Sequence, residues 1–241
     1  MHKFAVFDID GTLIRWQLYH ALVDGLIKHG LGDETLHGQI HDSRMDWKTR
    51  SHSEAFKDYE HNLVNIYNRL LTSMSVRQFN LVVNSVFEEY KDQVYVYTRD
   101  LIKDLKRQGY LLFAISGSQI EIIQKIARYY GFDGYSGSVY GQKDGRFTAK
   151  VSLPHLQKDQ VLKEFITKYQ AGFTDSIAVG DSTGDASMMQ LVQRPVAFNP
   201  EARLFQVAKE KGWKVVLERK NMIYELEQKD GKYELVKTNT G

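Results

Sequence analysis

Cysteine is absent from this chain of 241 residues, and proline occurs only three times. The lack of cysteine excludes disulfides, thiolate nucleophiles and cysteine-ligated zinc. Apolar runs fall short of the ~18 residues that a membrane span requires, and the first residues lack the apolar region of a signal peptide. We therefore expect a cytoplasmic protein without membrane insertion.

An excess of one charge is also lacking, because 32 lysines and arginines stand against 30 aspartates and glutamates. The sequence shows no basic cluster of the kind that binds nucleic acid, which is therefore not an expected partner. The length fits one large domain or two small ones. The sequence leaves the oligomeric state open between a monomer and a homodimer.

Short apolar runs alternate with helical patterns over much of the chain. The predicted strands are 3–7, 110–115, 176–179, 195–198 and 213–217. The predicted helices between them are 99–108, with Thr98 as N-cap, 119–130 and 156–169. This alternation predicts an α/β fold, in which helices cover both faces of a Rossmann-like parallel sheet.

One long helical stretch interrupts the alternation. Residues 15–94 are predicted as an inserted, mainly helical cap domain, with helices at 18–27, 56–71 and 76–90. The core domain is then 1–14 with 95–217, and it includes a hairpin at 136–151. Residues 218–241 form a C-terminal extension, in which alternating residues around Lys229-Asp230-Gly231 suggest a second hairpin.

Acidic residues follow two of the predicted strands. Asp8 and Asp10 end the first strand, and residues two apart in an extended chain project to the same side. Asp181 and Asp185 follow the strand at 176–179. Carboxylates gathered at one sheet edge need a cation, and oxygen ligands favour Mg²⁺. Taken singly, each loop is also compatible with an ordinary Asp-rich turn or helix cap.

Two further segments are candidates for anion binding. Ser116 and Gly117 end the strand at 110–115, and Ser118 with Glu121 has capping-box spacing at the next helix. Helix N-termini attract anions, although this segment alone is compatible with a capped helix. Lys158 opens the following helix, with Lys163 as its rival. His37 and His41 have metal-ligand spacing but no evident third ligand.

Together, four motifs resemble those of the haloacid dehalogenase (HAD) superfamily, in particular its phosphoserine-phosphatase-like subfamily IB. They are Asp8-Ile9-Asp10-Gly11-Thr12, Ser116, Lys158 and Gly180-Asp181 with Asp185, in the family's order. The helical insertion resembles a type I cap. The resemblance covers about residues 3–217.

The resemblance implies a phosphatase that acts on a small phosphorylated metabolite and uses Mg²⁺. Asp8 would be the nucleophile that forms an aspartyl-phosphate, and Asp10 the general acid and then base. Asp8, the Asp10 carbonyl and Asp181 would bind the metal, with Asp185 supporting them. The residues implied for phosphate binding are Ser116, Gly117 and Lys158.

Two departures from the family pattern concern the substrate. Where phosphoserine phosphatases carry an acid and a cap arginine for the amino acid, this chain has Gln17 and Tyr59 by approximate alignment. Phosphoserine is therefore an unexpected substrate. The alternatives are a phosphotransferase that uses the same intermediate and a non-catalytic binding protein that has kept the fold.

Overall fold

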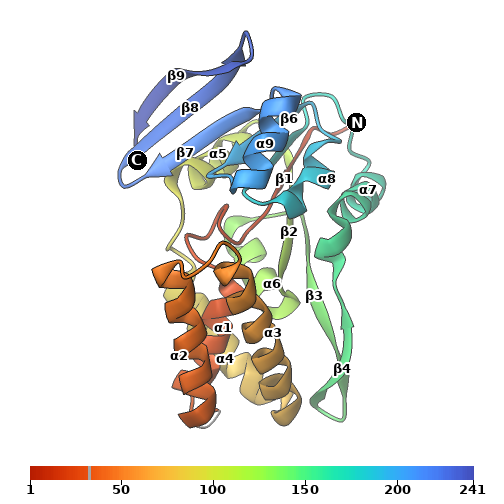
Figure 1. Ribbon diagram of the computed structural model, residues 1–241. Helices are drawn as coiled ribbons and strands as arrows, with labels where there is room; N and C mark the ends of the chain where they lie inside the picture. The colour runs from red at the N-terminus through yellow and green to blue at the C-terminus, as the bar shows by residue number, and fades with distance from the viewer. Residues whose placement is uncertain (32–33) are drawn as a thin grey trace. The chain divides into compact units, whose positions relative to one another are not determined.

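The computed structural model describes residues 1–31 and 34–241, which form two compact units (Figure 1). The sheet unit comprises Met1–Gln17, Tyr90–Ser138 and Leu153–Gly241. The helical unit comprises Leu18–Glu89 and Val139–Ser152. Among the described residues, no helix is long and apolar enough to cross a membrane.

A parallel sheet forms the centre of the sheet unit, in the order β3-β2-β1-β5-β6-β7. The strands are β1 (Phe4–Phe7), β2 (Leu111–Gln119), β3 (Gly134–Lys143), β5 (Ile177–Gly180), β6 (Arg194–Phe198) and β7 (Lys214–Arg219). All four residues of β1 are buried, as expected of a central strand covered on both faces. The predicted α/β fold with a parallel sheet is confirmed.

Helices follow the strands of the sheet unit and bury their apolar faces on it. They are α5 (Val96–Arg107), α6 (Ile120–Tyr130), α7 (Lys158–Tyr169), α8 (Ala186–Met189) and α9 (Ala202–Lys211). Residues from α7, α8 and α9 share one core cluster with Phe4 and Val6, the residues of one face of β1. Alternate strand residues point to opposite faces, so Ala5 and Phe7 face the other side, where Phe132 packs on Phe7.

The starts of two helices differ from the prediction. Helix α5 begins at Val96, so Thr98 lies inside it and its hydroxyl donates to the carbonyl of Thr12 at 2.8 Å. Glu218, a buried residue of β7, accepts from the first amides of this helix instead. Gln119, not Ser118, is the N-cap of α6. Both predictions were wrong because tertiary partners outside the local sequence bind these groups.

Four helices make up most of the helical unit. They are α1 (Leu18–Lys28), α2 (Glu34–Thr49), α3 (Ala55–Ser73) and α4 (Val76–Tyr90). The prediction contained counterparts of α1, α3 and α4 but not α2, whose sequence is polar over most of its length. An aromatic cluster fills this unit, where Trp47 stacks on Tyr59 with ring centroids 5.4 Å apart.

Residues 139–152 lie in a different unit from the one that the proposed domain boundaries give them. The predicted hairpin is present as the end of β3 and β4 (Arg146–Ser152), but it belongs to the helical unit rather than to the sheet unit. Phe147 packs edge-on against Phe79 at 5.1 Å, and the Tyr140 hydroxyl donates to Asn68 at 3.1 Å. These contacts join segments some seventy residues apart, which sequence patterning does not reveal.

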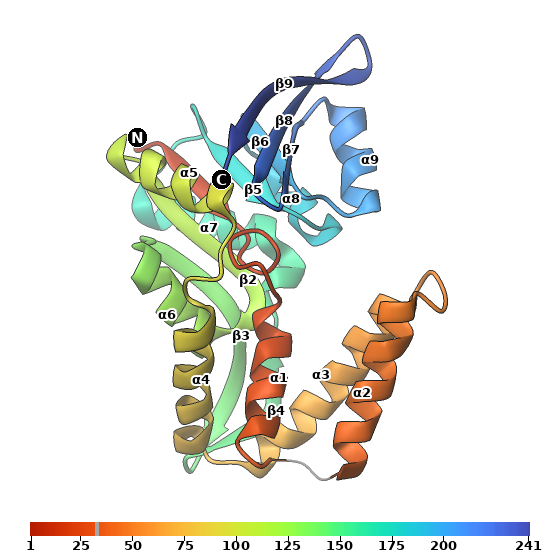
Figure 2. The same ribbon diagram turned by 90° about the vertical axis from the view of Figure 1, so that its left-hand side faces the viewer.

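The C-terminal extension forms the predicted hairpin and continues the sheet. Strands β8 (Met222–Lys229) and β9 (Lys232–Thr240) add antiparallel to β7 (Figure 1). Buried Glu225 accepts from Lys214 at 2.7 Å and from Asn239 at 3.2 Å. The chain ends beside the start of α5, where Gly241 lies against Val96 (Figure 2).

Candidate active site

The first acidic loop follows β1 directly. Asp8 and Asp10 are 5% and 9% exposed, and the Asp8 amide donates to Val179 of β5 at 2.9 Å. Gly11 has a φ of 82°, which favours glycine, and a Cβ there would lie 2.2 Å from Oδ2 of Asp181. Position 11 therefore favours glycine for two reasons, which are the backbone conformation of the turn and the close approach of Asp181.

The second acidic loop follows β5 and is organised by Asp185. Its Oδ2 accepts from the amides of Asp181 and Ser182 at 3.1 and 3.0 Å, and from the Ser182 hydroxyl at 3.0 Å. Gly180 allows this packing, because a Cβ there would lie 2.4 Å from that of Asp185. Fully buried Asp185 thus holds the loop that carries Asp181.

Lys158 joins the two acidic loops. Its ammonium donates to Oδ1 of Asp8 and to Oδ1 of Asp185, both at 2.6 Å, and to the carbonyl of Ile115 at 2.9 Å. The side chain is only 5% exposed. The rival Lys163 instead forms an exposed ion pair with Asp159. The first turn of α7 therefore brings Lys158, not Lys163, to Asp8.

The electrostatics of this cluster are unbalanced. The pKa of Asp8 is raised to about 7, and burial is the largest cause. The charge of Lys158 lowers this pKa, and the charges of Asp185 and Asp10 raise it. Burial and the charge of Asp8 likewise raise the pKa of Asp181 well above its usual range. Burial alone would lower the pKa of Lys158. The charges of Asp185 and Asp8 outweigh the effect of burial, so the pKa of Lys158 is raised. One ammonium does not neutralise this group of carboxylates.

A cation would fit among these carboxylates. One side-chain oxygen from each of Asp8, Asp181 and Asp185 lies within 4.8 Å of the others. Hard oxygen ligands of this kind suit Mg²⁺. The sequence had assigned Asp185 a supporting part, and its contacts with Lys158 and the loop amides agree with that part. The assignment of the Asp10 carbonyl as a ligand stays a prediction.

The predicted phosphate-binding serine lies against Asp10. The Ser116 hydroxyl donates to Oδ2 of Asp10 at 2.5 Å, and the Ser118 hydroxyl donates to Oδ1 at 3.0 Å. The Ser118 amide in turn donates to Oγ of Ser116 at 2.9 Å. Residues of β2 therefore fix both carboxylate oxygens of Asp10, an arrangement that explains why Ser118 does not cap α6.

Sequence reasoning missed His155 and Ser138. The Ser138 hydroxyl donates to the carbonyl of Gly117 at 2.6 Å and lies 3.4 Å from Nδ1 of His155. A Cβ on Gly117 would lie 3.5 Å from the His155 ring. Burial, and then the charge of Lys158, lower the pKa of His155. The position of His155 three residues before Lys158 was the one signal in the sequence.

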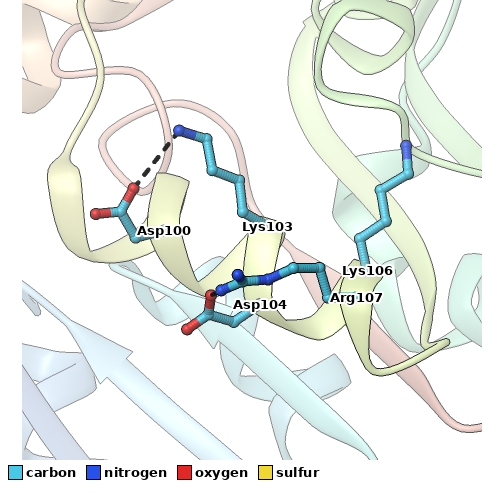
Figure 3. Close-up of a pocket in the computed structure, with 5 residues that line it drawn as sticks. All are labelled: Asp100, Lys103, Asp104, Lys106 and Arg107. Atoms are coloured by element: carbon cyan, nitrogen blue, oxygen red, sulfur yellow. Dashed lines mark hydrogen bonds and ion pairs between the residues drawn. The ribbon is translucent and has the colours of Figure 1, made fainter.

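A surface pocket on α5 is separate from these residues (Figure 3). Its lining residues are Asp100, Lys103, Asp104, Lys106 and Arg107. Arg107 pairs with Asp104, Lys103 lies 3.8 Å from Asp100, and Lys106 donates to the Gly131 carbonyl. Two of the three cations thus lie beside carboxylates of the same helix and the third binds a backbone carbonyl, and none of the predicted site residues lines the pocket.

The matching family model is that of haloacid dehalogenase-like hydrolases, and it matches residues 5–190. The chain belongs to this family. This range includes all four motifs identified in the sequence, and the predicted family membership is confirmed.

Named relatives are phosphatases, in agreement with the predicted phosphoric monoester hydrolase. A histidinol-phosphatase from Neisseria meningitidis is 27% identical over 231 residues, which cover 90% of this chain and 99% of the relative. A phosphoserine phosphatase, SerB1, from Mycobacterium tuberculosis is 28% identical over 145 residues, with 58% of this chain and 47% of the relative covered. The chain thus spans one relative almost entirely and about half of the other.

Solved structures share the fold. A phosphoserine phosphatase with a phospho-aspartyl intermediate analogue has a TM-score of 0.61 at 19% identity. The match covers 91% of this chain and 94% of the phosphoserine phosphatase chain. A protein of unknown function from Bordetella pertussis has a TM-score of 0.70 at 19% identity, with 89% and 98% covered.

Proposed function

We propose that the chain is a Mg²⁺-dependent phosphatase that hydrolyses a small phosphomonoester through an aspartyl-phosphate on Asp8. The observation that supports this most is the cluster of Asp8, Lys158 and Asp185, joined by two contacts of 2.6 Å and almost fully buried. Phosphoryl transfer depends on positioning and on neutralised charge. The cluster, at the ends of β1 and β5 and in the first turn of α7, supports the positioning, and Lys158 supplies part of the neutralising charge.

In the first half-reaction, a carboxylate oxygen of Asp8 attacks phosphorus while the bond to the leaving oxygen breaks. Asp10, held by Ser116 and Ser118, gives its proton to that oxygen. In the second half-reaction, water attacks phosphorus, Asp10 takes a proton from the water, and the bond to Asp8 breaks to release inorganic phosphate. The nucleophile thereby divides a difficult hydrolysis into two steps.

Lys158 supplies one positive charge for the phosphoryl group in this scheme, and a bound metal would supply more. The Lys158 ammonium orients Asp8 and attracts the phosphoryl oxygens. Asp8, the Asp10 carbonyl and Asp181 would hold Mg²⁺, which when bound would stabilise the negative charge that develops on the phosphoryl group. Asp185 orients both Lys158 and the Asp181 loop through its two carboxylate oxygens.

Steady-state hydrolysis of p-nitrophenyl phosphate with Mg²⁺ tests this function. Asp8→Asn is nearly isosteric, so we expect a folded variant with turnover at the background level. An Asp8→Asn enzyme that is folded and fully active would falsify the nucleophile. Product analysis with an added alcohol separates hydrolysis from phosphotransfer, because a phosphotransferase would yield the new ester.

Histidinol phosphate and phosphoserine are the first natural substrates to compare. The relative that matches along nearly its whole length is named for the former, a phosphomonoester with an ammonium group but no carboxylate. Tyr59, aligned with the cap arginine of phosphoserine phosphatases, is fully buried and accepts from Arg44 at 2.9 Å.

We propose that phosphoserine is the poorer substrate. Both esters carry an ammonium group, so only the contact to the phosphoserine carboxylate differs between them. A charge-assisted hydrogen bond contributes about 1.5–3 kcal/mol, so this one missing contact corresponds to at least about tenfold in kcat/KM. Parallel kinetics on the two esters measure this ratio. A higher kcat/KM for phosphoserine would overturn the substrate assignment and leave the aspartyl-phosphate chemistry intact.

A further inference from the structure

Glu201 binds the loop that carries Asp181 through loop atoms that Asp185 does not contact. Its backbone amide donates to the Asp181 carbonyl at 2.9 Å. Its carboxylate oxygen Oε1 accepts from the Thr183 amide at 2.7 Å and also from the Thr183 hydroxyl. A single residue therefore holds the loop at two points, one on each side of Ser182.

Glu201 has a firm support of its own. It is the N-cap of α9, a helix anchored by the fully buried side chains of Leu204 and Ala208. Two residues before it, Asn199 donates its amide to Val216 of β7 and accepts the Glu218 amide on Oδ1, both at 2.8 Å. The contacts from Glu201 thus tie the Asp181 loop to the sheet through β7.

We propose that Glu201 is a positioning residue for the metal site, and that it sets the place of the Asp181 carboxylate through the loop backbone. The inference rests on the proposed function, because it takes Asp181 to be a metal ligand. Asp185 is buried and also contacts Lys158, whereas Glu201 is exposed and contacts the loop at Asp181 and Thr183. The loop therefore has a buried anchor that also binds Lys158 and an exposed anchor, Glu201.

Direct Mg²⁺ binding to the whole protein, measured by titration calorimetry without substrate, tests the proposal. Groups that orient metal ligands are typically worth 10–100-fold in metal affinity. We expect Glu201→Ala to weaken Mg²⁺ binding by about tenfold. Glu201→Gln keeps an acceptor at Oε1 and should restore most of the affinity. Glu210→Ala, an exposed position on the same helix, is the matched control and should bind Mg²⁺ as the wild type does.

Activity offers a second readout. The Mg²⁺ concentration for half-maximal turnover should rise in Glu201→Ala, while kcat at saturating Mg²⁺ stays close to the wild-type value. A purely structural role would lower kcat and the melting temperature and leave this concentration unchanged, which would overturn the proposal.

Two further variants keep the outcomes separate. If Glu201→Ala does not fold, Thr183→Val replaces it as the test, because this variant removes the hydroxyl contact with Glu201 and keeps the amide contact. Unchanged Mg²⁺ affinity in Thr183→Val overturns the proposal.

Asp181→Ala tests the underlying metal site. If Asp181→Ala loses Mg²⁺ and Glu201→Ala does not, only the role of Glu201 fails. If Asp181→Ala binds Mg²⁺ normally, the proposed metal site itself fails.

Discussion

Each of the two units holds a cluster of charged side chains, and the clusters differ in balance. In the sheet unit, the Lys158 ammonium serves Asp8 and Asp185, and Asp181 adds another carboxylate. In the helical unit, Arg44 pairs one to one with Asp24 at 2.6 Å and also donates to the Tyr59 hydroxyl.

The difference in balance separates a reactive site from a structural one. The Arg44–Asp24 pair is complete within the protein, and both side chains are 26% exposed, which limits the cost of desolvation. The sheet-unit cluster is nearly fully buried and has more carboxylates than ammonium groups. Buried charges of one sign need a counter-ion or a proton, and such an arrangement is typical of functional sites.

The largest effect is expected from removing the Lys158 ammonium, which pairs with Asp8 and Asp185. Lys158→Met should lower turnover by about 10²–10³-fold, the usual cost of losing one such electrostatic contact. The unfolding free energy should also fall by about 3–5 kcal/mol, because buried carboxylates lose their partner. Kinetics and urea denaturation measure the two effects.

Lys163→Met is the matched control, since Lys163 lies in the same helix and forms an exposed pair with Asp159. Both quantities should stay near wild type in this variant. Turnover lost in Lys163→Met and kept in Lys158→Met would reverse the assignment of the two lysines.

In the helical unit, buried His20 should make the stability of the protein depend on pH. Burial, and then the charge of Arg44, lower the pKa of His20 from 6.5 to about 4. The unfolded chain therefore binds the proton first, and the stability that neutral His20 contributes above pH 6.5 is lost as the pH falls toward 4. The unfolding free energy should drop by about 2 kcal/mol between pH 7 and pH 5 from this group alone.

Urea denaturation at several pH values, followed by tryptophan fluorescence, measures this slope. His20→Phe should flatten the profile, because it removes the titrating ring and keeps an aromatic side chain among Phe56 and Tyr59. His41→Gln, at an exposed position, should leave the profile unchanged. Equal slopes in wild type and His20→Phe would assign the pH dependence to other groups.

The smallest effect is expected from the balanced pair. Arg44→Met should cost about 1 kcal/mol of stability, since partly exposed ion pairs contribute little. Turnover at saturating substrate should not change. A double-mutant cycle with Asp24→Asn gives the coupling energy, and a large fall in turnover for Arg44→Met would show instead that the guanidinium meets the substrate.

The sequence predicted the sheet and the motif positions well because both depend on local patterns. Strand β1 is a short apolar run with Asp8 at its end, and neither property requires knowledge of distant residues. Contacts across long separations were harder to predict. Ser118 had capping-box spacing, yet its hydroxyl binds Asp10, 108 residues away.

Residues without a motif were missed for the same reason. Glu201 and Glu218 are ordinary acidic residues in the sequence, and their contacts with Thr183 and with the start of α5 appear only in the folded chain. Helix α2 lies within the stretch predicted as mainly helical but was not singled out, because its buried apolar positions, such as Leu36 and Ile40, are few.

The central place of the first strand has a consequence for synthesis. Strand β1 precedes both of its neighbours in the chain, because β2 begins at Leu111 and β5 begins at Ile177. Pairings between such distant segments form slowly. One edge of β1 therefore stays unpaired until β2 has been made and the other edge until β5 has been made, and its apolar residues are exposed to aggregation meanwhile. Asp8 gains its contact with Lys158, and Lys158 its contact with Asp185, only after those later segments emerge, so the buried cluster cannot assemble before residue 185 has been made.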